Sequence, residues 1–167
     1  MSVEEPESGS DSAELLSGYL DYFRAVVIGK LDRLSDTELR HSRLPSGWTP
    51  LELLKHLIFM ERRWFQWGLM AEPVDQPWGD GLERWQVTDD DTLATLTGLL
   101  TEVSSRTREI LARVDLAAPA AVGGRFERAD EAPTGLWICL HVLQEYARHA
   151  GHRDIARERI DGTTGES

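Results

Sequence analysis

The stretch Thr49-Pro50-Leu51-Glu52-Leu53-Leu54-Lys55-His56-Leu57 carries the clearest helix start in the chain. Thr49 is placed to cap the helix, Pro50 suits the first helical position, and Glu52 completes a capping box with Thr49. Apolar residues then recur at helical spacing, so we expect this helix to continue to about Met70. An amphipathic helix with such a start needs partner helices that cover its apolar face.

Three further segments show the same apolar repeat. The first helix is expected to start at a capping box formed by Asp11 and Glu14 and to run to about Leu31. Another is expected over residues 91 to 114, and the last from about Pro133 to Gly162, which suits a C-cap. The apolar positions of this last helix include Trp137, Leu140, Leu143 and Ile155. Four amphipathic helices without a convincing strand pattern predict an all-α four-helix bundle.

The length of 167 residues predicts one domain, with an acidic disordered tail over residues 1–11, the bundle over 12–162 and a flexible end over 163–167. The net charge of −11 disfavours nucleic acid and anionic membrane surfaces as partners. No apolar run approaches the roughly 20 residues that span a bilayer. Since the amino terminus also lacks the features of a secretory signal, we expect a cytoplasmic protein.

Two connections between the helices stand out. Residues 71–90 form a long one that contains Trp78 and Trp85, and long loops tend to be functional. These tryptophans are expected either to cover the core or to contact a substrate. Residues 115–132 contain Pro119, Gly123 and Gly124 and predict an irregular connector.

The last helix carries a stripe of potential metal ligands. At about 100° per residue, Glu145, His149 and His152 fall within roughly 60° of arc, and His141 lies one turn earlier on the same stripe. Imidazole nitrogen and carboxylate oxygen are ligands that Zn²⁺ and Ni²⁺ accept. Cys139, the single cysteine, lies on the opposite side of this helix and predicts a buried structural thiol.

A third ligand would come from the helix that starts at Thr49. His56 shares a line with Leu53 and Met60, where a solvent-facing residue would be out of place. The alternative is a core histidine bonded to a backbone carbonyl. Glu52 lies one turn before His56, but its capping function favours one metal ion over a dinuclear centre.

Two stretches resemble the DinB/YfiT-like superfamily: Trp48-Thr-Pro-Leu-Glu-Leu-Leu-Lys-His56-Leu57 and Leu140-His-Val-Leu-Gln-Glu145-Tyr-Ala-Arg-His149-Ala-Gly-His152-Arg-Asp-Ile155. The resemblance covers residues 12–162 and is greatest to the actinobacterial branch related to mycothiol S-transferases and mycothiol-dependent maleylpyruvate isomerase. It implies an up-down-down-up four-helix bundle, often a homodimer, with one divalent metal ion. The isomerase pattern of His, Glu, His implies the ligands His56, Glu145 and His149.

The chain departs from this pattern at two histidines. His152 stands where many relatives have glutamine, so it is either a pocket group or an alternative ligand. His141 has no ligand role in the pattern. Both are candidate catalytic residues, since an imidazole near bound water can act as a general base.

Three protein ligands leave a coordination position open, which is typical of a catalytic site. The resemblance favours a transferase that activates mycothiol, a low-molecular-weight thiol, for attack on a small electrophile. Arg148 and Arg153, and also Arg157, are candidates for holding anionic parts of the thiol or substrate. Two alternatives stay open: a metal-dependent hydrolase that uses bound water, and a metal-containing binding protein without turnover.

Overall fold

The computed structural model describes residues 4–7, 11–77 and 86–162, and within them the chain is all-helical, as predicted. Pro119 and Thr134 form an isolated bridge, and no described residue belongs to a β-strand. The described part contains no helix that is both long and apolar enough to cross a membrane. The elements are α1 (Ser12–Gly29), α2 (Asp36–Arg40), α3 (Pro50–Arg62), the π-helix η1 (Arg63–Leu69), α4 (Leu93–Leu111) and α5 (Gly135–Asp161).

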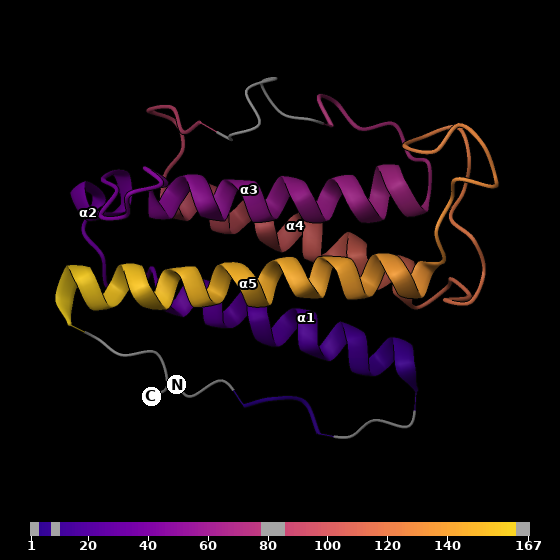
Figure 1. Cartoon of the computed structure of the whole chain (residues 1–167), viewed down its shortest axis with the longest axis horizontal. Coiled ribbons are helices and arrows are strands. Elements are labelled where there is room, and N and C mark those ends of the chain that lie inside the picture. Colours follow the sequence, from indigo (N-terminus) through magenta and orange to yellow (C-terminus); the bar gives the residue numbers. More distant parts are fainter. Residues whose placement is uncertain (1–3, 8–10, 78–85, 163–167) are drawn as a thin grey trace.

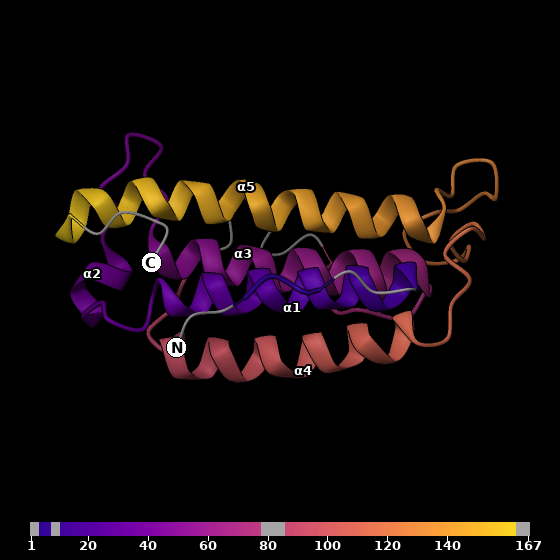
Figure 2. The ribbon, with the colours of Figure 1, turned by 90° about the horizontal axis from the view of Figure 1, so that it is seen from below.

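The four long helices lie side by side, and each contacts two others (Figures 1 and 2). α1 packs against α4 and α5, and α3 packs against the same two helices. The short helix α2 lies beside α3 at one end of the molecule (Figure 1). The candidate ligands on α3 and α5 therefore come from helices in direct contact.

The predicted helix starts agree with the structure in most cases. The Thr49 hydroxyl accepts a hydrogen bond from the Glu52 amide at 3.2 Å, and the Glu52 carboxylate accepts one from the Thr49 amide at 3.0 Å. At α1, Asp11 is the N-cap as predicted, but its carboxylate accepts from the Ala13 amide, so the predicted capping box with Glu14 is not what the structure shows. A capping box that the sequence reading missed starts α2, where Ser35 and Glu38 bond to each other's amides.

The helix that starts at Thr49 reaches Leu69, but it changes from α to π geometry after Arg62. Its last carbonyls have no partner further along the helix, so they need donors from elsewhere. The connector over residues 115–132 supplies them, because the Ala121 amide donates to the Leu69 carbonyl and the Arg125 amide to the Trp67 carbonyl. Trp78 and Trp85 of the long connection lie outside the described residues.

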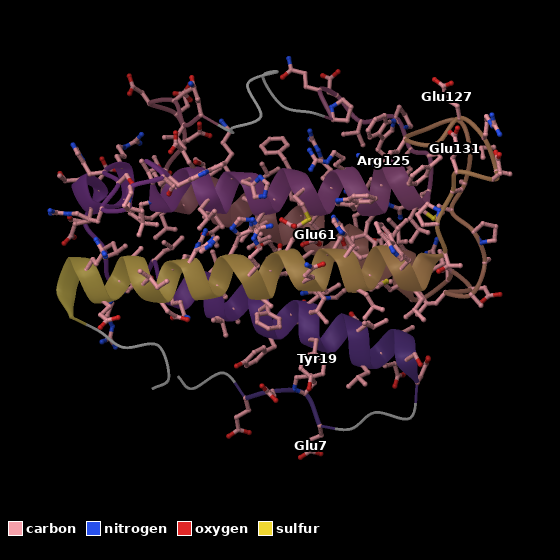
Figure 3. The ribbon with its side chains drawn as sticks, in the orientation of Figure 1. Glu7, Tyr19, Glu61, Arg125, Glu127 and Glu131 are labelled. Atoms are coloured by element: carbon pink, nitrogen blue, oxygen red, sulfur yellow. The ribbon has the colours of Figure 1, made fainter. Side chains whose placement is uncertain are left out.

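A buried carboxylate joins the four long helices. Glu61 of α3 has no exposed surface and lies between the helices (Figure 3). It accepts two hydrogen bonds from Arg24 of α1, one from Thr107 of α4 at 2.6 Å and one from Tyr146 of α5 at 2.6 Å. Burial, together with the Glu61 charge, raises the pKa of Tyr146 well above its usual value, so its hydroxyl stays a donor.

The apolar surface of α5 differs from the one that the sequence suggests. Trp137, Leu140 and Ile155 are each about half exposed, at 50%, 52% and 51%. The face packed in the core consists of Ile138, Cys139, Val142, Tyr146 and Ala150. Cys139 is buried as predicted, and burial raises the pKa of its thiol to about 12.

Removing Arg24 should destabilise the fold far more than removing a comparable surface arginine. The change Arg24→Met leaves Glu61 buried without its cation, a loss that costs about 3–5 kcal/mol in similar cases. Arg108 also makes two hydrogen bonds to a carboxylate on another helix, that of Asp21, but at the surface. Arg108→Met should cost no more than about 1 kcal/mol. Urea unfolding of both variants measures the difference, and equal losses would contradict the assigned importance of Glu61.

Candidate metal centre

His56 of α3 and Glu145 and His149 of α5 come together between the two helices. One ligand atom from each lies within 4.8 Å of the other two. The Glu145 Oε2 lies 3.3 Å from the His149 Nε2 and 3.8 Å from the His56 Nε2. An ion with tetrahedral bonds of about 2.0–2.2 Å separates its ligand atoms by roughly 3.3–3.6 Å. The contact between Glu145 and His149 falls in this range, and the contact between Glu145 and His56 is slightly longer, so a small approach of His56 would complete the spacing that one small cation requires.

The His56 side chain is held in an aromatic setting and lacks a polar partner. Its ring contacts the His149 ring edge-on at 5.0 Å between centroids, and the Trp48 ring at 5.7 Å. Both ring nitrogens are buried, and among the described residues neither has a hydrogen-bond partner. The alternative of a histidine bonded to a backbone carbonyl is thus not what the structure shows. A buried nitrogen without a hydrogen-bond partner is explained if it binds a metal ion.

Both candidate ligand histidines are neutral at pH 7. Burial, reinforced by the neighbouring His149, lowers the pKa of His56 from 6.5 to about 4. Burial, reinforced by His152, lowers the pKa of His149 to about 4 as well. Their contacts with Glu145 are therefore not ion pairs at neutral pH. Neutral imidazole is the form that binds metal ions, so the donor set fits a divalent cation.

The two candidate catalytic histidines flank the cluster on α5. His152 is exposed, and its Nδ1 lies 3.3 Å from the Nδ1 of His149. His141 is half-buried, stacks on Trp137 and lies 4.4 Å from the Trp64 ring between centroids. Burial lowers the pKa of His141, which keeps it neutral and able to accept a proton at pH 7.

The three candidate arginines lie in different surroundings. Arg148 is exposed, and its Nη1 lies 3.8 Å from the Glu145 Oε1. Arg153 is buried and donates to the Val27 carbonyl, and burial lowers its pKa to about 9. Arg157 donates to the Lys30 carbonyl at 2.5 Å. Their binding of a thiol or substrate stays a prediction, and only Arg148 presents its guanidinium to solvent beside the cluster.

Glu52 does not take part in the cluster. Its carboxylate accepts from the Thr49 amide, as the capping box requires. Among the described residues, the group with metal-binding geometry contains His56, Glu145 and His149 and no further acid.

Sequence reasoning missed several neighbours of the cluster. Trp48 precedes the Thr49 cap and its ring contacts that of His56. Its place at the start of the quoted motif could have indicated that it lies near the candidate metal centre. Arg63 follows His56 by seven residues, and its charge contributes to lowering the pKa of His56. Arg125 lies over Trp64, yet it belongs to a connector without a sequence pattern of its own.

Comparison with known proteins gives one family. A family model described as mycothiol-S-transferase matches residues 15–162. No curated protein and no solved structure matches the chain. The family match covers most of α1 and all of α2, α3, η1, α4 and α5, and includes every residue of the candidate metal centre.

The metal-free protein should lose stability as the pH falls from about 6.5 to about 4. In that window the unfolded chain protonates His56 and His149, whereas the folded protein, whose two pKa values are about 4, does not. The free energy of unfolding must therefore decrease with falling pH. Urea unfolding at pH 7 and pH 5 should show a smaller decrease for His56→Gln than for the parent. The exposed His41→Gln is the control, and an unchanged decrease in His56→Gln would count against the lowered pKa.

Proposed function

The chain belongs to the mycothiol S-transferase family, and from this premise we propose a metal-dependent transferase that activates mycothiol for attack on a small electrophile. The observation that supports it most directly is the convergence of His56, Glu145 and His149 from two helices. The three side chains are each only partly exposed, with fractions of 12–17%, so one side of the cluster stays open to a ligand. An open position is what distinguishes a catalytic from a structural metal site.

His56, Glu145 and His149 would hold the ion through two nitrogens and one oxygen. This mixed set suits a borderline cation, which favours Zn²⁺ or Ni²⁺. When bound, the ion supplies Lewis acidity, which deprotonates a coordinated thiol at neutral pH. The half-buried site excludes part of the solvent and so strengthens this electrostatic effect.

Other side chains of the site would then accept the proton of the thiol and orient the reactants. The thiol loses its proton to solvent or to a neutral imidazole, and His152 and His141 are the candidates. The sulfur forms a bond to the electrophilic carbon of the substrate, and the leaving group departs with the electrons of its own bond. Arg148, beside Glu145 at the surface, can contact polar parts of the thiol.

The proposal extends to the arrangement of the protein. We propose the up-down-down-up order for α1, α3, α4 and α5, supported by the contacts of α1 with α5 and of α3 with α4. We also propose a homodimer in the cytoplasm, where a cellular thiol would be the cosubstrate. Sedimentation analysis of the purified protein tests the dimer.

His56→Ala and His149→Ala should each abolish stoichiometric metal binding while leaving helical content largely intact. The apolar faces of the helices supply most of the folding energy, so the ligands can be removed without loss of the bundle. Titration with Zn²⁺ and Ni²⁺, followed by circular dichroism, measures both properties. His41→Ala, a histidine outside the cluster, should bind metal as the parent does. Parent-like binding by either ligand variant would remove that residue from the site.

Cys139→Ser should retain thiol transfer, because the reacting sulfur belongs to the cosubstrate and Cys139 is buried. Glu145→Gln should lose most of the activity through weaker coordination. Product formation from mycothiol and a chlorinated nitroarene, in the presence of the metal, measures both. The rate should rise with pH through a pKa below the value of about 8.5 for a free thiol. An inactive, folded and metal-loaded Cys139→Ser would overturn the mechanism, and ester hydrolysis without thiol would indicate a hydrolase.

A further inference from the structure

The two ring nitrogens of His149 face different neighbours. Its Nε2 lies 3.3 Å from the Glu145 Oε2, the same oxygen that lies 3.8 Å from the His56 Nε2. Its Nδ1 lies 3.3 Å from the Nδ1 of His152, within hydrogen-bond reach. Because the two nitrogens of an imidazole point away from each other, His152 lies on the far side of the His149 ring from Glu145.

His152 stands outside the group of candidate ligands. Among the residues that the structure describes, the group with metal-binding geometry consists of His56, Glu145 and His149. His152 is exposed, whereas those three side chains are mostly buried. A hydrogen bond to the remote nitrogen of a ligand is the usual way in which a protein orients a metal-bound imidazole. His152 has the position of such a partner rather than that of a fourth ligand.

The hydrogen bond between the two imidazoles has a direction. It needs a protonated nitrogen on one ring and a lone pair on the other. When His149 binds a cation through its Nε2, its own proton must lie on Nδ1. The Nδ1 of His152 is then the acceptor, and the proton of His152 lies on its Nε2. Without a cation the reverse direction also satisfies both contacts, because the His149 Nε2–H can donate to Glu145.

We propose that His152 is a positioning residue of the metal centre: it accepts a hydrogen bond from the Nδ1–H of His149 and so directs the His149 Nε2 toward the ion. The inference rests on the proposed metal site and not on thiol transfer. It also narrows the choice of proton acceptor. Once the Nδ1 of His152 accepts from His149 and its Nε2 carries a proton, neither nitrogen has a lone pair for the proton of a thiol. His141 is then the remaining candidate.

The surroundings fix the two histidines of α5 more closely than His56. Arg153, the residue after His152, is buried, and its Nη1 donates to the Val27 carbonyl of α1 at 3.1 Å, which fixes α5 at this point. The His149 and His152 rings lie 5.4 Å apart between centroids. Within the described part of the chain, neither nitrogen of His56 has a hydrogen-bond partner. His149 is therefore the imidazole ligand whose orientation the chain itself can set.

The affinity for Zn²⁺, measured by competition with a chelating dye, tests the positioning role. His152→Ala should weaken binding about 10–100-fold, the usual effect of removing the partner of a ligand. His152→Gln should recover most of the affinity, because its amide oxygen can accept from the His149 Nδ1–H. His41→Ala should bind as the parent does, since His41 is exposed and contacts the Thr37 carbonyl instead. Circular dichroism of each variant confirms that the helices are intact.

Two outcomes of this titration would overturn the inference. Parent-like affinity in His152→Ala would show that the contact with His149 does not orient the ligand. A His152→Gln variant that binds no better than His152→Ala would indicate a fourth ligand, because an amide oxygen replaces an acceptor well and an imidazole ligand poorly.

Long-range ¹H–¹⁵N NMR correlations of the zinc-loaded protein test the direction of the hydrogen bond. His149 should carry its proton on Nδ1, and His152 should carry its proton on Nε2. A proton on the Nδ1 of His152, or zinc bound to either nitrogen of His152, would overturn the inference. Both measurements use the metal without thiol. If the parent binds zinc as expected but transfers no thiol, the transferase proposal fails and the role of His152 stands. If the parent takes up no metal, both proposals fail.

Discussion

The carboxylate of Glu61 is the constraint on which the arrangement of the bundle depends. A buried charge is strongly unfavourable unless hydrogen bonds and an opposite charge compensate it, and Glu61 receives four hydrogen bonds from three other helices. These bonds can form only when Arg24, Thr107 and Tyr146 all face the same point. The apolar contacts between helices tolerate small rotations, whereas this network does not. It therefore selects one rotation for each of the four long helices.

This selection has a direct consequence for the candidate metal centre. Tyr146 points into the core toward Glu61, so the preceding residue, Glu145, is turned by about 100° toward the edge of α5. His149 follows one turn later on the same side, and the structure places both against His56 of α3. The orientation of the candidate ligands is thus linked to a polar network that contains none of them.

The sequence predicted the features that depend on local spacing. The Thr49 capping box is a pattern of four residues, and the stripe of Glu145 and His149 follows from the helical period alone. The same local logic applied to Ser35 and Glu38 would have found α2, which was overlooked. The pairing of Arg24 with Glu61 joins residues far apart in the chain. No local pattern encodes this pair, since the energy that decides it comes from tertiary contacts.

The arginines show why residue type alone could not assign function. A guanidinium binds oxygen in a carboxylate ligand and in a backbone carbonyl with similar geometry, so Arg153 and Arg148 look alike in the sequence. Arg153 stands one turn after His149, a position that suggested a ligand contact. In the structure its Nη1 donates to the Val27 carbonyl, an acceptor in the last turn of α1, where a cation is also favoured by the helix dipole, and contact with a ligand stays a prediction.

The candidate metal centre lies between two contacts that hold α5 against its neighbours. At one end Arg153 ties α5 to the last turn of α1, and its second nitrogen reaches the Pro50 carbonyl in the first turn of α3 at 3.5 Å. At the other end, His141 of α5 packs on Trp64 of η1. Glu145 and His149 lie between these contacts, so their approach to His56 is limited on both sides. Such a position allows both imidazoles to stay neutral, and His56 to stay without a hydrogen-bond partner, while the site keeps its shape, which favours tight binding of a metal ion.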